Sequence, residues 1–365
     1  MNRLFSVGII FLLIFMSFQL VRAQGSPFFA TRIGLETWSI GGAHVARLNN
    51  PAAPMHNPAS LMTSGLDVYL EVGSTFRTKY LDFEPDKKYL PGYISFSTLI
   101  KDFHLAVGYA NNYNFDIDSG PENPDKPSEG RGLKNKIIMH TFFAIVRYPL
   151  HEKIVLGATI GVNYLKETEE FKGLELGFRG NGWGPQIIIG LLYSPIKKLT
   201  FGTSFHFLNE IQLKNDFTTP VRDDTSRGTS RIILGMDRLN VKFPWSLQFG
   251  LRYETVSFLH LYAMLDYQKW SKVLEAFDDK LQVHLGAKII PASQFTLGLG
   301  FFTLNDPGAQ FLDQKFLTFG IQFKIHKNFG FYASLLDSHL LSHKKAKQTF
   351  LGAGFKFSKN GLLNL

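Results

Sequence analysis

Five cationic residues near the ends of alternating, strand-like segments have the clearest chemical potential in this sequence. Alternate residues of a strand face opposite sides, so all five are expected to point into the interior of a closed sheet. Such a collar would attract the carboxylate of an amphiphile, whose tail would rest on Phe350. The competing interpretation is a set of ion pairs with Asp67, Glu71 and Glu254 that fills the interior and holds a plug. The collar comprises Arg147, Arg252, Lys288, Lys324 and Lys356.

No group of residues has the spacing of a catalytic or metal site. His260 and Asp266 share a strand face but are separated by about 20 Å along the strand, too far for a proton-transferring pair. The histidines form no His-Glu-x-x-His pattern, and Gly298-Leu299-Gly300 lies within a strand rather than between a strand and a helix. We therefore predict a protein that is not an enzyme and that holds neither a metal nor a cofactor.

Alternation of apolar and polar residues is the dominant pattern, as in residues 349–357, where Leu351, Ala353, Phe355 and Phe357 share one face. Recurring segments of about ten such residues, separated by turns, are typical of transmembrane barrels. We predict an all-β fold, a transmembrane antiparallel β-barrel of about 14 strands with an N-terminal plug in its lumen. The predicted strands are 66–78, 92–100, 103–114, 137–148, 154–165, 185–194, 199–208, 245–255, 259–270, 281–290, 295–304, 316–325, 329–336 and 349–357.

The connections between these segments alternate in length. Short ones such as Lys101-Asp102 are expected on the periplasmic side and long ones such as 116–136 on the outer side, which places both chain ends in the periplasm. Residues 231–236 also have strand character, but counting them would make the strand number odd and invert the later loops. We therefore assign residues 214–242 to one long, partly folded outer loop.

The composition narrows the class of protein. The chain has 365 residues, 35 of them Phe, 33 Gly and none Cys, and a formal net charge of +9. A mean hydropathy of -0.02 excludes a bundle of membrane helices. The Lys and Arg residues are scattered over turns, loops and strand ends, which disfavours a nucleic-acid-binding surface.

Four regions follow from these patterns. Residues 1–23 carry Arg3, an apolar run and Val21-Arg22-Ala23, which predicts a cleaved secretory signal peptide in preference to a membrane anchor. Residues 24–65 are predicted to be the plug, 66–357 the barrel and 358–365 a periplasmic tail. Export combined with strand alternation indicates the outer membrane of a diderm bacterium.

The predicted plug does not alternate. Pro51, Pro54 and Pro58 exclude a regular strand or helix there. Irregular backbone at membrane depth is tolerated only inside protein, so we expect this segment to lie within the barrel.

Two parts of the sequence resemble the FadL/TodX family of outer-membrane transporters of hydrophobic compounds. Members carry a glycine–alanine segment followed by Asn-Pro-Ala, a small residue and Leu. The match here consists of residues 41–46 and 57–61, which contain the plug motif Gly41, Gly42, Asn57, Pro58 and Ala59. A second match is a proline before a strand, Phe243-Pro244, with a hairpin partner that ends in Trp270-Ser271.

The resemblance implies passive transport of hydrophobic or amphiphilic molecules, with long-chain fatty-acid-like compounds as the expected class. It also implies a kinked third strand that opens the wall sideways, for which Gly108 and Asn111 are the candidate residues. The related PorV/PorQ proteins share the N-terminal pattern, so a role in a protein secretion system is the alternative.

The expected partners follow from the barrel interpretation. They are outer-membrane lipid, a hydrophobic small-molecule ligand and the barrel insertion machinery, which recognises the last strand. No nucleic acid is expected, and the protein is expected to be a monomer.

Overall fold

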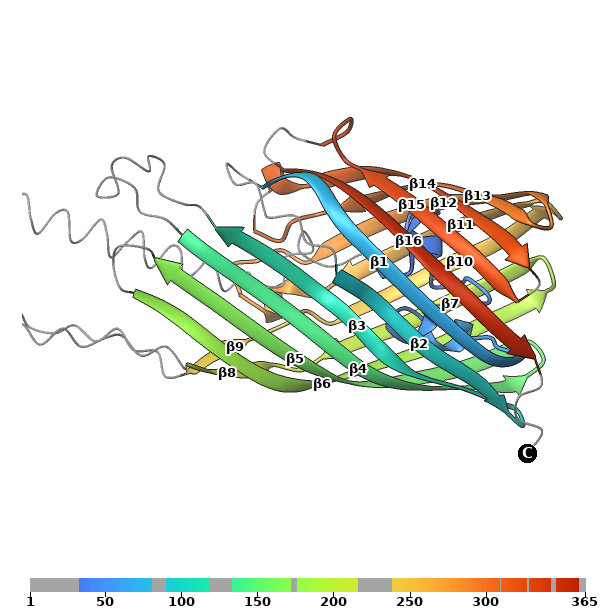
Figure 1. Ribbon diagram of the computed structural model, residues 1–365, viewed down its shortest axis with the longest axis horizontal. Coiled ribbons are helices and arrows are strands. Elements are labelled where there is room, and N and C mark those ends of the chain that lie inside the picture. The colour runs from blue at the N-terminus through green and yellow to red at the C-terminus, as the bar shows by residue number, and fades with distance from the viewer. Residues whose placement is uncertain are drawn as a thin grey trace, which may run out of the picture.

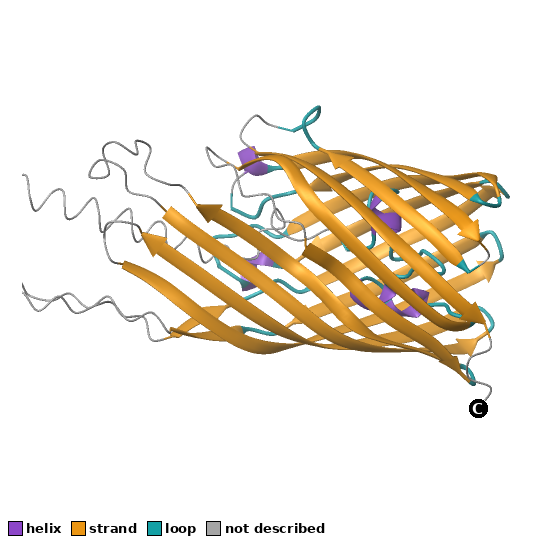
Figure 2. Cartoon of the chain, viewed as in Figure 1, coloured by secondary structure: helices purple, strands orange, loops and turns teal. Residues whose placement is uncertain are grey.

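The computed structural model describes residues 33–80, 90–118, 133–171, 176–215, 238–308, 310–326, 328–342 and 346–360. Most of these residues form long antiparallel strands (Figure 2). Within the described ranges, no helix is long and apolar enough to cross a bilayer. The predicted signal peptide, residues 24–32 of the predicted plug and residues 361–365 of the tail lie outside these ranges.

Fourteen strands close into a barrel, which confirms the predicted fold class. Each strand pairs antiparallel with its neighbours, β1 pairs with β16, and β5 pairs with β6 to complete the ring. The first seven are β1 (Gly65–Tyr80), β2 (Leu90–Ile100), β3 (Phe103–Asp118), β4 (Leu133–His151), β5 (Ile154–Phe171), β6 (Leu176–Ile196) and β7 (Leu199–Leu208). The others are β10 (Ser246–Val256), β11 (Leu259–Gln268), β12 (Lys280–Ala292), β13 (Phe295–Leu304), β14 (Gln314–His326), β15 (Phe329–Asp337) and β16 (Ala346–Asn360).

Two strands outside the ring were not predicted. β8 (Ile211–Asn215) and β9 (Arg238–Val241) pair with each other, and β8 also pairs with β6, so they extend the wall at the long-loop end. They overlap the segment that the sequence assigned to one outer loop. The last strand also continues to Asn360, opposite Gly65, so the barrel ends three residues beyond the predicted Phe357.

The ladders of β2 are described in part. β2 pairs with β1 as far as Gly73 and with β3 as far as Ala110 (Figure 1), and residues 81–89, which precede β2, lie outside the described ranges. The pairing of β3 with β4 shifts between Asn111 and Tyr113, which leaves Asn112 as a bulge.

Outward side chains are apolar around the ring, as the alternation predicted. Phe249, Leu251 and Leu261, all predicted to face lipid, expose 53%, 37% and 41% of their surface. Their chain neighbours Gln248 and Arg252 are buried in the lumen. The strand pattern therefore builds a barrel with an apolar outer surface and a polar, filled interior.

Residues 33–64 lie inside the ring of strands and are called the inner segment below (Figure 1). The inner segment contains α2 (Leu35–Trp38), η2 (Ala53–Met55) and η3 (Pro58–Ser60) and is otherwise irregular. The remaining short helices, η4 (Trp270–Lys272) and η5 (Gln310–Leu312), lie between strands. Most of the inner segment is buried, including Leu35, Val45 and Ala59.

A belt of glycines in the wall lets the inner segment approach the strands closely. At each of these positions an added Cβ would collide with an atom of the inner segment, first Leu35 beside β16, then Val45 beside β10, and finally Pro58 beside β5. The inner segment thus follows the wall strand by strand. The belt comprises Gly157, Gly190, Gly202, Gly250, Gly286, Gly300, Gly320 and Gly352.

We expect Gly190→Ala to lower the free energy of unfolding by about 1–3 kcal/mol, the usual cost of overpacking. The new methyl group would collide with the Asn57 side chain. The matched control is Gly330→Ala, because the nearest atom to its added methyl group lies 3.7 Å away. Chemical unfolding of the purified barrel measures both, and equal losses for the two variants would contradict the role of the belt.

Candidate functional site

A buried ion-pair cluster fastens the inner segment to the wall. The Glu36 carboxylate lies 2.5 Å from Arg47 Nη2 and 3.0 Å from Lys288 Nζ on β12. Burial alone would raise the pKa of the Glu36 carboxyl, but the attraction of Arg47 and Lys288 outweighs burial and lowers that pKa to about 2. Glu36 is therefore ionised at neutral pH.

A second carboxylate, Glu71 of β1, receives the start of α2. It accepts hydrogen bonds from the backbone N–H groups of Gly34 (2.7 Å) and Leu35 (2.6 Å). The Tyr69 hydroxyl also donates to it. Backbone donors at the beginning of a helix have no partner within the helix, so the wall supplies one.

The Asn57 side chain explains the Asn-Pro-Ala part of the plug motif. Its oxygen accepts a hydrogen bond from Ala59 N (3.0 Å) and so caps η3, in which Pro58 occupies the first position. Its nitrogen donates to the Val45 carbonyl (2.6 Å), which ties two distant parts of the inner segment together. The same nitrogen lies 3.3 Å from the Leu191 carbonyl of β6.

The two motif glycines turn the inner segment against β12 and β13. Gly41 and Gly42 have φ values of 70° and 72°, in the left-handed region that favours glycine. Gly41 N donates to Thr318 Oγ1 (3.0 Å), and the Gly41 carbonyl accepts from His284 Nδ1 (2.7 Å). All five motif residues thus have structural roles in the inner segment.

Three of the five predicted collar residues lie in ion pairs. Lys288 contacts Glu36, Lys356 lies 3.1 Å from Asp67, and Arg252 lies 3.0 Å from Glu254. Glu36 was not among the counter-charges expected from the sequence, whereas Glu71 binds backbone N–H groups instead of a cation.

The two remaining members of the collar differ in their surroundings. Lys324 is exposed near the short-turn end of β14, and Arg147 lies opposite His104 in the β3–β4 ladder. Phe350 lies six residues before Lys356, about 20 Å along β16. It packs with Leu35, Phe302 and other apolar residues on the long-loop side of the inner segment. A ligand-binding role for the collar and for Phe350 stays a prediction.

The residues predicted to form a lateral opening differ in their surroundings. Gly108 lies in continuous ladders with Ser95 and Phe143, and an added Cβ would collide with the Ile94 carbonyl. Asn111 lies next to the bulge at Asn112, beyond the end of the β2–β3 ladder. An opening itself stays a prediction, and Asn111 lies beside the bulge in the β3–β4 ladder.

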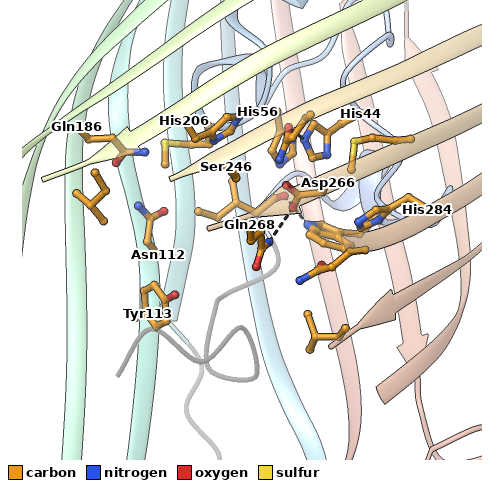
Figure 3. Close-up of a pocket in the computed structure, with 18 of the residues that line it drawn as sticks. His44, His56, Asn112, Tyr113, Gln186, His206, Ser246, Asp266, Gln268 and His284 are labelled. Atoms are coloured by element: carbon orange, nitrogen blue, oxygen red, sulfur yellow. Dashed lines mark hydrogen bonds between the residues drawn. The ribbon is translucent and has the colours of Figure 1, made fainter. Parts of the chain in front are cut away.

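A cavity of about 270 Å³ lies within the lumen, between the inner segment and the long-loop end (Figure 3). The inner segment contributes Trp38, His44 and His56, and β3 contributes the bulge residue Asn112 together with Tyr113. The cavity therefore extends from the inner segment to the bulge in the β3–β4 ladder. Its other lining residues are Ile33, Met55, Met139, Gln186, His206, Leu208, Ser246, Gln248, Met264, Asp266, Gln268, Gln282, His284 and Leu304.

One side of the cavity carries a row of polar side chains on neighbouring strands. Gln248 of β10 lies opposite Asp266 of β11, which lies opposite Gln282 of β12. Gln248 accepts a hydrogen bond from the Ser204 hydroxyl (2.9 Å) and contacts His44 Nε2 (2.9 Å). The cavity is thus amphipathic, with Met, Leu and Trp surfaces beside hydrogen-bonding groups.

The sequence indicated that Asp266, Gln248 and Gln282 face inward, but it did not identify them as a site. Alternation gives the face of a side chain, whereas a shared cavity depends on the register of several strands and on the path of the inner segment. His44 and His56, whose rings stack at a centroid distance of 4.1 Å, have no periodic signal at all.

Comparison with solved structures identifies the fold of this chain. No family model matches this sequence, and no curated protein matches it. Among solved structures, the toluene transporter TodX of Pseudomonas putida is 14% identical, with 92% of this chain and 100% of that chain covered and a TM-score of 0.67. The Ralstonia pickettii toluene transporter TbuX is 15% identical, with 90% and 98% covered and a TM-score of 0.66.

A FadL homologue of Pseudomonas aeruginosa is 12% identical, with 90% of this chain and 99% of that chain covered and a TM-score of 0.65. At such identities the likeness shows the fold alone. The chain therefore has the fold of FadL/TodX-type channels, in agreement with the resemblance of its plug motif.

We expect Glu36→Gln to destabilise the barrel by about 3–5 kcal/mol, because it leaves the buried Arg47 without its counter-charge. Asp278→Asn is the matched control, since Asp278 is exposed and 3.6 Å from Lys280. Unfolding in urea compares the two variants with the unsubstituted protein. If Glu36→Gln lowers the free energy of unfolding no more than the control does, the ion pairs do not hold the inner segment in place.

Lowering the pH should weaken the ion pairs of Glu36 within a defined pH range. The pKa of Glu36 is about 2 in the folded protein against 4.5 ordinarily, so its contribution is complete above pH 4.5 and is lost as the pH falls through 2. The contribution is about 3 kcal/mol. We expect the stability difference between the unsubstituted protein and Glu36→Gln to be constant from pH 7 to 5 and to shrink below that. A difference that already falls between pH 7 and 6 would exclude this carboxyl as the cause.

Proposed function

We propose that this protein lets hydrophobic or amphiphilic molecules pass without energy input across the outer membrane of a diderm bacterium. The proposed ligands resemble long-chain fatty acids in having one apolar chain and one polar head. The observation that carries this proposal is the amphipathic cavity inside a closed barrel. An apolar wall with a few convergent polar groups is the usual composition of a small-molecule site.

The size of the cavity limits what it holds. At about 270 Å³ it is near the lower end of the roughly 300–1,000 Å³ typical of ligand pockets. It therefore accommodates a polar head and the first part of a chain, with the remainder of the chain directed toward the long loops. Aromatic and aliphatic residues such as Phe302 and Phe350 line the lumen on that side.

The proposed path avoids the straight route along the barrel axis. The inner segment acts as a plug in this proposal, since its backbone contacts glycines on strands from β5 round to β16. Ligand would instead leave the cavity sideways past Asn112, where the β3–β4 ladder is bulged. Bulges of this kind are common beside functional sites.

The outer surface supports the proposed location. Apolar side chains such as Phe319, Leu335 and Phe355 are exposed on the outer face of the strands. A continuous apolar surface of this kind requires lipid or another apolar partner to cover it. Closed antiparallel barrels and helices are the structures that satisfy every backbone group within a bilayer.

Filling the cavity should block transport. We expect Ser246→Phe to reduce uptake of radiolabelled dodecanol, an uncharged amphiphile, at least tenfold in cells that lack their own fatty-acid channel, because Ser246 lines the cavity. Ser257→Phe is the control, since Ser257 is exposed in a short turn. Heat-modifiable migration in gels verifies that both variants fold. No uptake by the unsubstituted protein above an empty vector would refute transport of this ligand class and favour the secretion-component alternative.

Removal of the inner segment tests its role as a plug. We expect deletion of residues 41–61 to raise single-channel conductance in planar bilayers several-fold, because the lumen would then fill with water. The full-length protein is the reference, and folded barrel is verified in the same way. Unchanged conductance of a folded deletion variant would show that the lumen is closed by other residues.

A further inference from the structure

The cavity contains hydrogen-bond acceptors that are buried and lack donors. Asp266, only 6% exposed, accepts a hydrogen bond from Gln268 Nε2 at 2.8 Å through Oδ2. The side chains of Ser246 and Gln248 lie near the same carboxylate, but among the described residues no donor meets Oδ1 with hydrogen-bond geometry. The side-chain oxygen of Gln186, 9% exposed, is in the same situation. Figure 3 shows both side chains at the cavity, on separate strands of the wall. Burying an acceptor without a donor costs free energy. These atoms therefore indicate a ligand group that donates hydrogen bonds to them.

The cavity offers no permanent cation to these acceptors. None of its described lining residues is Lys or Arg, and within the described ranges Asp266 forms no ion pair. Burial lowers the pKa of His44 to about 4 and that of His56 well below its usual range, so both are uncharged at neutral pH. Arg47 of the inner segment acts electrostatically on His44 and His56, but it is ion-paired with Glu36. Lys288 is also paired with Glu36 and is six residues, about 20 Å, from Gln282 along β12.

This distribution disfavours an ionised carboxylate as the group that enters the cavity. Asp266 would repel a carboxylate, and no described cation in the lining would compensate the repulsion. The cavity instead favours a group that donates hydrogen bonds, because Asp266 Oδ1 and the Gln186 amide oxygen are both acceptors. Gln282, 3% exposed, carries an amide nitrogen without an acceptor and can bind a lone pair of the same ligand.

We propose that the cavity selects amphiphiles whose polar head donates hydrogen bonds, with a primary ammonium group as the best match. The ammonium donates to Asp266 Oδ1, while the alkyl chain lies against Met264 and Leu304. This inference rests on the proposed function and deepens it, because it assigns the head-group chemistry of the transported molecule. It places selection at the cavity, apart from the cationic collar at the short-turn end.

The test compares three ligands that differ only in the head group. Radiolabelled dodecylamine, dodecanol and dodecanoate are bound to the full-length protein in phosphatidylcholine nanodiscs at pH 7, with protein-free nanodiscs as the blank. We expect dodecylamine to bind at least tenfold more tightly than dodecanoate, since hydrogen bonds to charged groups exceed neutral ones in strength. Dodecanol should lie between the two.

Two variants assign the preference to Asp266. Asp266→Asn keeps the shape of the side chain and removes its charge, and we expect it to reduce the amine-to-carboxylate ratio at least tenfold. Asp278→Asn removes an exposed carboxylate 3.6 Å from Lys280 and should leave the ratio unchanged. An unchanged ratio in folded Asp266→Asn would overturn the assignment, as would equal or tighter binding of dodecanoate by the unsubstituted protein.

Failure of this inference and failure of the proposed function give different results. Specific binding of all three ligands without an amine preference removes only the head-group selection. If Ser246→Phe has no effect on the binding of any ligand, the cavity is not the binding site and this inference is overturned as well. Absence of saturable binding for all three ligands counts against transport of long-chain amphiphiles as a whole.

Discussion

Irregular backbone inside a barrel must find hydrogen-bond partners, and this requirement determines how residues 33–64 contact the wall. Turns within the segment satisfy many of its backbone groups, and the wall or side chains satisfy others. Glu71 receives two N–H groups of α2, Thr318 receives that of Gly41, and Asn57 bridges Val45 and η3. These contacts work only at short range. The glycine belt is therefore a precondition for them, because any side chain at Gly202 or Gly300 would hold the two backbones apart.

The barrel was predictable from the sequence because the pattern that indicates it lies within each single strand. A strand with one lipid-facing side alternates with period two, and this signal survives without knowledge of any partner strand. Phe249 and Leu261 accordingly lie where alternation predicts, as do Gln248 and Arg252. The β8–β9 hairpin was missed because its strands are short and their pairing spans more than twenty intervening residues, so neither carries a full alternating period.

The candidate site was less predictable, because it forms where non-periodic backbone meets several strands. Alternation indicated that Lys288 points inward, but not that its partner is Glu36, which precedes it by more than two hundred residues. The Asn-Pro-Ala motif was visible as a resemblance, yet its physical reason, a cap that also reaches the Val45 carbonyl, appears only in three dimensions. Asp266 was recognised as inward-facing and then considered only for catalysis with His260. The register with Gln248 and Gln282 places it in a cavity instead.

Charge is distributed unevenly along the lumen, and under the proposed function this asymmetry bears on how the cavity discriminates among ligands. Toward the short turns, Lys288, Lys356 and Arg252 are each paired with a carboxylate, so these three cations are largely committed to holding the structure together. Toward the long loops, the buried Asp266 has an oxygen without a donor. Attraction between unit charges falls with distance and is screened by water, so a head group within the cavity responds to Asp266 far more than to cations about 20 Å away. Under the proposed function, selection is therefore determined by the groups that line the cavity, whatever the net charge of the chain.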